Sequence, residues 1–287
     1  MYEFVSIQKE DYPVKTVCRA LGISRSSYYE YIQEKTYQVD VQAMESVQRM
    51  FVLHRRRYGS RRISKALRHQ GIKVGRFKVR RLMKEGHLKA IQPKSFVPKT
   101  TNSKHTLGYA PNVLASIDFP KAPNRVFVGD ITYLPTTYGQ WLYLNVWIDL
   151  FSRRVVGWKL DTNMEEGLAV HSFNQARNTR TPPTGLIVHT DRAGQYAGAE
   201  FKLALKGCTQ SMSGVDNPYD NAHAESFFSR FKAELLEKGA FESLEDARTE
   251  VFNYIEMYYN THRLHSSLGY LSPAQFELQY YEAERNA

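Results

Sequence analysis

The chain has 287 residues, 42% hydrophobic and 13% aromatic, which is enough for one large domain or for two to three small ones. Its two cysteines, Cys18 and Cys208, are far apart, which argues against a cysteine zinc site or a disulfide framework. The sequence contains no apolar stretch long enough for a membrane helix and no signal-peptide pattern at its start, so we expect a cytoplasmic protein.

The charge is distributed unevenly along the chain, whose net charge is +10. Residues 1–110 hold 23 Lys and Arg against 8 Asp and Glu, whereas residues 111–287 hold 16 against 21. A basic N-terminal half is typical of proteins that bind a polyanion. A general solubilising charge is the alternative interpretation.

Residues 1–38 have the pattern of a helix-turn-helix. Apolar residues recur at helical spacing from Val14 to Leu21, Gly22 can end this helix, and Ser24 can cap the next one. The pattern predicts a helix-turn-helix-like segment. An ordinary helical hairpin that makes no DNA contact fits it equally well.

Residues 39–92 predict a second, more basic helical domain. A first amphipathic helix begins near Val41, and Ser60 is expected to cap a second. A third helix is expected to turn Phe77 and Leu82 towards the core. The cations on the outer faces predict phosphate contacts with DNA, although a merely solvated helix face is the alternative. The predicted contacts are Arg55, Arg56, Arg57, Arg61, Arg62, Arg76, Lys78, Arg80 and Arg81.

Residues 93–120 lose this periodicity and gather prolines, which predicts an extended linker that lies along DNA or a partner. Residues 121–284 then change to short apolar strands and helices. Their order (three strands, a helix, a strand, a helix and a last helix) predicts an α/β domain with a mixed sheet. The expected strands are Arg125–Leu134, Trp141–Leu150, Arg153–Leu160, Leu186–His189 and Thr209–Met212, and the expected helices are Glu165–Arg177, Ala199–Leu205 and Asp220 to about Gly239.

Three carboxylates lie in or next to the predicted strands and the last predicted helix of this domain. Asp130 lies inside the first strand, Asp191 follows the fourth, and Glu225 lies in the first turns of the last helix, one turn after Asn221. A carboxylate in an apolar strand is costly unless it is compensated, and divalent cations compensate converging carboxylates. Two such ions catalyse attack on phosphodiesters. Each acid alone also has a structural interpretation, as a bulge, turn or surface residue, but their joint occurrence favours a two-metal site.

Several residues near these acids have expected roles of their own. Asp149 is expected to be structural, and His189 either packs or tunes the site. Gln195 and Tyr196 are candidates to orient a substrate phosphate. Further candidate DNA contacts near the site are Arg192, Lys202, Lys232 and Arg263.

The motifs that contain these acids resemble one known family. They include Gly129-Asp-Ile-Thr-Tyr-Leu, Ile148-Asp-Leu-Phe-Ser-Arg-Arg, His189-Thr-Asp-Arg, Asn217-Pro-Tyr-Asp-Asn-Ala and Ala224-Glu-Ser-Phe-Phe. The chain resembles the DDE transposases of the bacterial insertion-sequence-three type, specifically the product of the second reading frame. Asp191 and Glu225 have 33 residues between them, slightly fewer than is usual in that family.

The resemblance implies an RNase H-like catalytic core like that of retroviral integrases. It implies Asp130, Asp191 and Glu225 as the catalytic, metal-binding triad, with two Mg²⁺ ions and Mn²⁺ as a substitute. It further implies cleavage at the terminal inverted repeats of an element, strand transfer into target DNA, a homodimer or larger assembly on DNA, and a nucleoid-associated location in a bacterium. An upstream-frame DNA-binding protein is an expected fusion or partner. An RNase H-like nuclease without strand transfer, and a DNA-binding regulator with an inactive core, are the alternatives.

Overall fold

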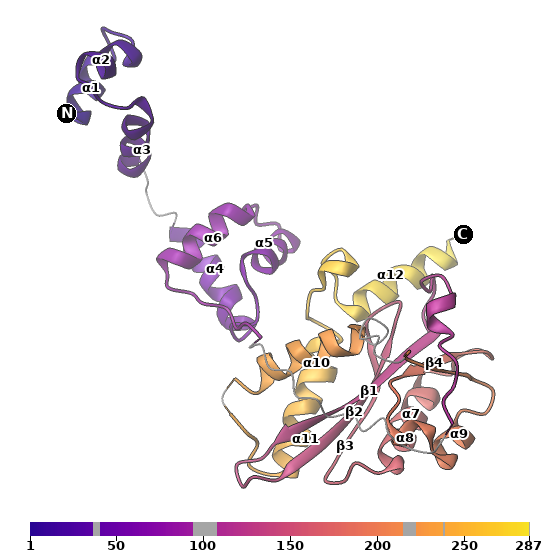
Figure 1. The fold of residues 1–287 in the computed structure, drawn as a ribbon. Helices are drawn as coiled ribbons and strands as arrows, with labels where there is room; N and C mark the ends of the chain where they lie inside the picture. The colour runs from indigo at the N-terminus through magenta and orange to yellow at the C-terminus, as the bar shows by residue number, and fades with distance from the viewer. Residues whose placement is uncertain (37–40, 94–107, 215–221, 238, 287) are drawn as a thin grey trace.

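The computed structural model describes residues 1–36, 41–93, 108–214, 222–237 and 239–286. Helices alone make up the N-terminal part, and a sheet with helices on both faces makes up the rest (Figure 1). This arrangement confirms the predicted α/β mixed-sheet domain behind an all-α region. No helix in the described ranges is long and apolar enough to cross a membrane.

The first three helices form a small unit with its own core. They are α1 (Tyr2–Gln8), α2 (Val14–Ala20) and α3 (Arg25–Thr36). Val5, Cys18 and Tyr28 are buried together between them. Gly22 lies in the turn after α2 with a φ of +66°, which glycine adopts without steric cost, and α3 begins directly after Ser24. The predicted helix, glycine turn and second helix are therefore confirmed.

The next three helices form the helical unit, the name used below for residues 41–92. They are α4 (Val41–Leu53), α5 (Ser60–His69) and α6 (Arg76–Glu85). Two expectations were wrong in detail. Gly59, not Ser60, is the N-cap residue of α5. Phe77 is 78% exposed, because the buried stripe of α6 is set by Val79 and Leu82, and Phe77 lies on another side of that helix.

The described part of the predicted linker packs against the sheet domain. It contains a short 3₁₀ turn, η1 (Leu114–Ser116). The backbone N–H of Leu114 donates to Ser211 Oγ (3.2 Å), and the carbonyl of Pro111 accepts from the N–H of Met212 (3.3 Å). Both partners belong to the edge strand of the sheet, so this part of the segment lies along that edge. The expectation that residues 93–120 lie along DNA or a partner stays a prediction.

The sheet has five strands in the order β3-β2-β1-β4-β5. The first three are antiparallel neighbours, and β4 and β5 run parallel to β1. The strands are β1 (Val126–Pro135), β2 (Trp141–Asp149), β3 (Val155–Asp161), β4 (Ile187–Thr190) and β5 (Thr209–Met212).

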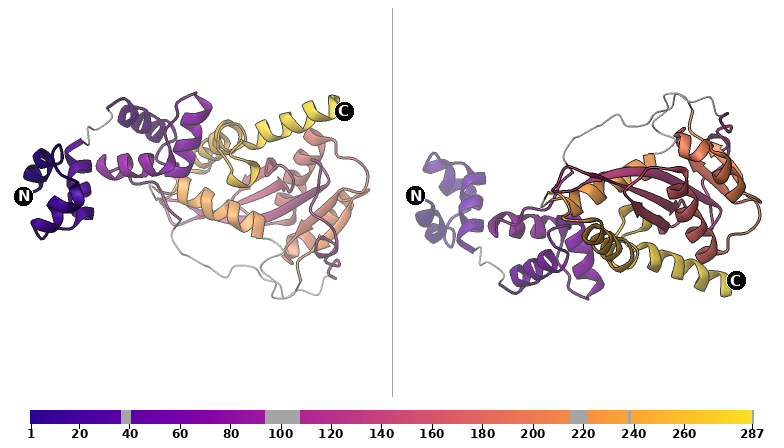
Figure 2. Two further views of the ribbon diagram at one scale, coloured as in Figure 1. Left: turned by 90° about the horizontal axis from the view of Figure 1, so that it is seen from above. Right: turned by 90° about the horizontal axis from the view of Figure 1, so that it is seen from below.

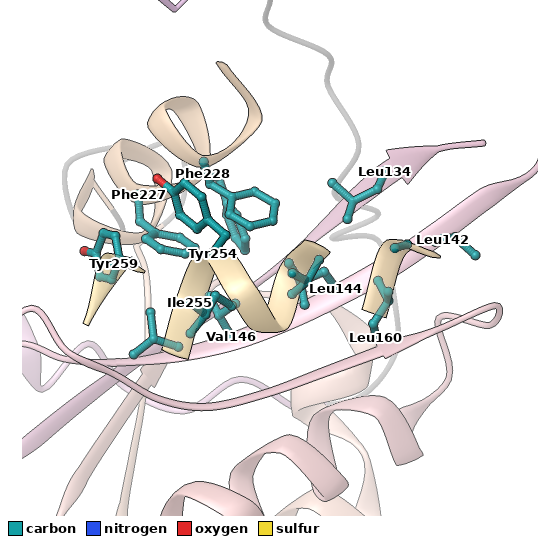
Figure 3. Packing of buried hydrophobic residues seen from close by; sticks show 14 of the residues in the cluster. Leu134, Leu142, Leu144, Val146, Leu160, Phe227, Phe228, Tyr254, Ile255 and Tyr259 are labelled. Carbon is teal, nitrogen blue, oxygen red and sulfur yellow. The ribbon is translucent and has the colours of Figure 1, made fainter. Parts of the chain in front are cut away.

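The two faces of the sheet are covered by different helices (Figures 1 and 2). On one face, Val146 and Leu144 belong to one buried cluster with Phe227 of α10 (Ala222–Leu235) and with Ile255, which follows α11 (Leu244–Phe252). Figure 3 shows Val146 beside Ile255 in this cluster. On the other face, Trp147 packs against Phe173 of α7. The helices of this second face are α7 (Glu166–Arg180), α8 (Gly194–Ala197) and α9 (Ala199–Ala204). Because side chains alternate along a strand, even-numbered residues of β1 face α10. The predicted cap of α10, Asp220, lies outside the described residues.

The C-terminal elements close the domain, and the sequence analysis had assigned none of them. They are α11, the π-helical turn η3 (Asn253–Tyr259), the 3₁₀ turn η4 (Ser266–Leu268) and α12 (Pro273–Arg285). Glu277 of α12 is buried and accepts hydrogen bonds from Arg180 (2.7 Å), Arg154 (2.8 Å) and Ser152 (2.8 Å). The last helix is therefore bonded to both α7 and the β2–β3 turn.

The helical unit is bonded to the C-terminal segment of the sheet domain. The hydroxyl of Tyr58 donates to the carbonyl of His262 (3.0 Å) and accepts from the N–H of Leu264 (2.8 Å). Arg62 Nε donates to the carbonyl of Leu264 (2.9 Å). Leu264 is itself buried in the core of the helical unit. The two parts thus share a core residue as well as hydrogen bonds.

Candidate active site

Asp130 lies on β1, and Asp191 directly follows the neighbouring parallel strand β4. Val128 of β1 is the register partner of His189 of β4, and the two aspartates come two residues further along the chain. Adjacent strands are about 4.8 Å apart, so the register brings these carboxylates together. Asp130 Oδ1 accepts from the N–H of Ile131 (2.8 Å), and Asp191 Oδ1 accepts from the N–H of Ala193 (3.1 Å).

Gly129 sets the packing of β1 just before Asp130. A Cβ atom at this position would lie 2.3 Å from the ring of Trp147, its partner in β2. The buried indole therefore occupies the space that any larger residue would need. The sequence analysis did not assign a role to this glycine, although a glycine inside a strand is a known signal of close approach.

Glu225 lies on α10, over the same face of the sheet as Asp130. Ala224 is buried against Val126 and Val128 of β1, which holds the first turn of the helix on that strand. Glu225 follows Ala224 and is exposed. Asn221, the expected neighbour one turn earlier, lies outside the described residues.

The charges of Asp191 and Glu225 affect the pKa of Asp130. Burial raises the pKa of Asp130 well above its usual value, and the carboxylate of Asp191 raises it further. Glu225 adds to this pKa shift, whereas the Ile131 N–H and Lys232 oppose it. A pKa raised by like charges marks an uncompensated anionic site, which is a common property of catalytic centres.

Lys232 is a cation of α10 that interacts with Asp130. It lies two turns after Glu225 on α10, and its Nζ is 4.3 Å from the ring centroid of Tyr133 of β1. Burial lowers the pKa of Lys232, and Asp130 opposes that shift. The structure thus brings Lys232 to the acidic site, as the sequence analysis expected.

The donor atoms at the site suit a hard divalent cation, because all three side chains are carboxylates. The repulsion that raises the pKa of Asp130 is also what a bound cation would relieve. In the described part of the chain, no three His, Cys, Asp or Glu side chains form a group that could hold a metal ion. The observed arrangement is therefore a pair of aspartates on adjacent strands with Glu225 on the overlying helix.

Asp149 and His189 are structural. Asp149 is buried and accepts from the N–H groups of Asn124 (2.6 Å) and Ser152 (2.9 Å), as expected for a structural acid. His189 is also buried, with Nδ1 2.8 Å from Ser211 Oγ, so it packs in the core.

Tyr196 is fully buried and its hydroxyl is hydrogen-bonded to Asn145. Burial, followed by Asp130 and Asp191, raises the pKa of Tyr196 well above its usual value, so the phenol stays neutral. The expectation that Tyr196 orients a substrate phosphate is therefore wrong. Gln195 is half-buried and donates to the carbonyl of Met164 (2.9 Å), and its contact with phosphate stays a prediction.

The predicted DNA-contacting cations divide into two groups. Arg55, Arg61, Arg76, Arg80 and Arg81 are exposed, and Lys78 is half-buried on α6. Arg81 also lies 4.0 Å from the carboxylate of Glu85, one turn along the same helix. The other group bonds to more distant parts of the chain. Arg56 pairs with Glu237 (3.1 Å), Arg62 bonds to Leu264, and Arg192 Nε donates to the carbonyl of Ser213 (2.8 Å).

Arg57 and Arg263 are unavailable to DNA in this structure. Arg57 is 9% exposed and its guanidinium lies 4.5 Å from the ring centroid of Tyr258. Arg263 is 2% exposed and forms an ion pair of 2.6 Å with buried Glu234. Both predictions are corrected for the same reason: the arginines stabilise the junction of the C-terminal segment instead of a surface.

Comparison with known proteins agrees with this architecture. Family profiles of the integrase core domain match residues 120–218 and 206–273, and an HTH-like domain matches residues 38–96. These matches confirm the predicted integrase-type, RNase H-like core and the HTH-like region before it.

Among curated proteins, the transposase of insertion sequence element IS904 from Lactococcus lactis is 42% identical over 237 residues, 81% of this chain and 92% of that protein. Transposase InsF of insertion sequence IS3A from Escherichia coli K12 is 38% identical over 283 residues, 96% of this chain and 98% of that protein.

Solved structures that are similar include a chain of the simian T-cell lymphotropic virus intasome, with a TM-score of 0.46, 18% identity, and coverage of 75% of this chain and 70% of that one. The HTLV-2 integrase catalytic core in complex with magnesium gives a TM-score of 0.42 and 16% identity, over 55% of this chain and 98% of that one.

Proposed function

The chain belongs to the IS3-type insertion-sequence transposases, and from this membership we propose that it cuts DNA at the terminal inverted repeats of its element and joins the freed 3′ ends to target DNA. It is a transposase with an integrase core domain. The observation that carries the proposed chemistry is the meeting of Asp130 and Asp191 at neighbouring parallel strands beneath Glu225.

Asp130, Asp191 and Glu225 are the residues that would hold Mg²⁺, or Mn²⁺ in its place, with two ions per site. When bound, such ions supply an activated water or 3′-hydroxyl and charge stabilisation at the leaving oxygen. The protein contributes position: β1 and β4 fix the two aspartates rigidly, and the packing of Ala224 fixes the helix that carries Glu225.

The DNA is proposed to lie across the exposed cations of α6 and reach the acidic site beside Lys232 and Arg192. Lys232 supports this path because it lies on α10 and interacts with Asp130. Phosphate contacts of this kind position DNA without reading its sequence. A homodimer or larger assembly on DNA, an upstream-frame DNA-binding partner and a nucleoid-associated cytoplasmic location stay predictions.

We propose a corresponding division of labour among four segments: 1–38, 39–92, 93–120 and 121–284. The separate buried clusters of the first, second and fourth segments support this division. The first two segments would bind DNA, and the fourth would carry out the chemistry.

The triad assignment is tested with Asp130→Asn and Glu225→Gln, assayed on DNA that carries the ends of the encoding element. We expect each variant to fold and bind DNA with unchanged affinity but to lose cleavage by about 10³-fold or more, because a metal ligand is removed. Glu200→Gln, an exposed acid on α9, is the matched control and should cut normally. If either variant retained metal-dependent cleavage, the assignment of Asp130, Asp191 and Glu225 as the catalytic triad would be wrong.

The same assay separates the two alternatives. A joined product distinguishes transposition from a nuclease that only cuts. Absence of cleavage by the unmodified chain with Mg²⁺ and with Mn²⁺ would favour the regulator with an inactive core.

A further inference from the structure

A cavity of about 450 Å³ lies at the β2–β3 end of the sheet domain, apart from the acidic site. The rings of Phe119, Phe151 and Phe276 line it, together with the cations Lys121 and Arg153. None of the described residues that line it is acidic. An aromatic surface beside cations, with no opposing carboxylate, is the composition of a site for a base and its phosphate.

The rings form an ordered surface. Phe151 and Phe276 have centroids 5.1 Å apart, which joins the β2–β3 turn to α12. The ring of Phe119 is 52% exposed and lies 5.2 Å from the guanidinium carbon of Arg153. A flat group that entered the cavity would therefore meet ring faces and one guanidinium plane.

Arg153 has an unfavourable backbone conformation and a buried nitrogen without a hydrogen-bond partner among the described residues. Its backbone φ is +62°, a conformation that non-glycine residues seldom adopt. Its Nη1 atom is buried and has no hydrogen-bond partner among the described residues. Burial also lowers the pKa of its guanidinium, with Tyr259 and Asp149 opposing the shift. A phosphate oxygen would satisfy this nitrogen and its charge.

The cavity is adjacent to the first turn of α10, the helix that carries Glu225. The rings of Phe119 and His223 are 6.4 Å apart in an edge-on arrangement, and His223 lies two residues before Glu225 on α10. A DNA strand that passes Glu225 would therefore run close to the cavity.

The geometry points to a binding pocket for one unpaired nucleotide of the DNA substrate, with its base against Phe119 and Phe151 and its phosphate on Lys121 and Arg153. The inference rests on the proposed function, because it assumes that DNA lies at the acidic site. The bases of an intact duplex are stacked and paired, so only an unpaired or extruded nucleotide offers a free ring face to this surface.

The test uses the full chain and a mixed-sequence, fluorescein-labelled 20-nucleotide strand, alone or as its duplex. We expect Phe119→Ala combined with Lys121→Ala to weaken binding of the single strand about tenfold and of the duplex less than about twofold, by anisotropy. Phe252→Ala, an aromatic residue of α11 with a similar exposed fraction of 48%, is the control and should change neither affinity. A single strand that carries 5-iodouracil should cross-link to peptides containing Phe119 or Phe151.

Unchanged single-strand affinity, or an equal loss for single strand and duplex, would overturn the pocket assignment. Cross-links confined to other peptides would overturn it as well. Cleavage by Asp130→Asn tests the proposed function independently, since that substitution leaves the pocket intact. If the pocket variants bind normally while Asp130→Asn is inactive, the pocket inference alone is wrong.

Discussion

The helical unit and the sheet domain contain the same number of cations but use them differently. Residues 41–92 hold 15 Lys and Arg against 2 Asp and Glu, and residues 121–284 hold 15 against 20. In the sheet domain, Arg154, Arg180 and Arg263 are bonded to buried carboxylates. On α6, Arg76, Arg80 and Arg81 are exposed, and Arg81 lies 4.0 Å from the carboxylate of Glu85. The supply of acidic residues, more than the number of cations, therefore separates the exposed cations of α6 from the buried ionic network of the sheet domain.

The largest effect on DNA binding should come from removing the exposed cations of α6. We expect the triple variant Arg76→Ala, Arg80→Ala and Arg81→Ala to bind duplex DNA about 100-fold more weakly and to lose about 2.7 from the slope of log affinity against log salt, because each phosphate contact releases counterions. Anisotropy titrations at several salt concentrations measure both.

The matched control removes three cations of the sheet domain that lie outside its buried networks: Lys159→Ala, Lys206→Ala and Arg248→Ala. Its affinity should change far less than that of the α6 variant. Equal losses in the two triple variants would break the comparison between the two regions.

Glu234→Gln tests the buried network of the sheet domain. Burial alone would raise the pKa of Glu234, but Arg263 outweighs it and lowers that pKa, so the carboxylate is ionised. The substitution leaves Arg263 buried without a counter-charge and should cost about 3–5 kcal/mol of unfolding free energy. Urea denaturation measures the loss. Glu245→Gln, which breaks the surface pair with Arg248, should cost less than about 1 kcal/mol.

Gly129→Ala should destabilise the sheet domain by about 1–3 kcal/mol, because the added methyl group displaces the buried ring of Trp147 next to Asp130. Cleavage should decrease together with stability, since the same displacement moves β1. Gly75→Ala in the helical unit is the control: a Cβ there meets nothing within 4 Å, and the effect on urea denaturation should be slight. Equal losses would contradict the packing explanation.

The smallest expected effect is a pH dependence at the junction of the two regions. Burial, then His262 and Arg57, lowers the pKa of His54 to about 4, below the value of about 6.5 in an unfolded chain. The unfolded state binds the proton more readily, so this contribution to stability is complete above about pH 6.5 and is lost as the pH falls towards 4. His54→Phe, which can retain the stacking on Tyr58, should flatten the dependence of Tm on pH.

His69→Phe is the control for that substitution, because His69 lies at the exposed end of α5. It should leave the pH dependence of Tm unchanged. If Tm depended on pH equally in His54→Phe and in the unmodified chain, the assignment of this pH dependence to His54 would be wrong.

Local periodicity was sufficient to predict the order of strands in the sheet domain and to place Asp130 on β1 and Asp191 after β4. It could not show that β1 and β4 are neighbours, with Val128 opposite His189, because the two strands pair across a long stretch of chain. The same limit explains Arg263, whose partner Glu234 lies 29 residues away. The prediction for Phe77 failed for a different reason. Apolar character alone did not decide whether Phe77 or Val79 of α6 faces the core of the helical unit.

The hydrogen bonds that Tyr58 makes to His262 and Leu264 have a consequence for the geometry of cleavage. If α6 holds DNA and the site at Asp130 cuts it, as proposed, the shared buried core fixes the distance between the two. The number of base pairs between the held segment and the cut bond would then be set by the fold.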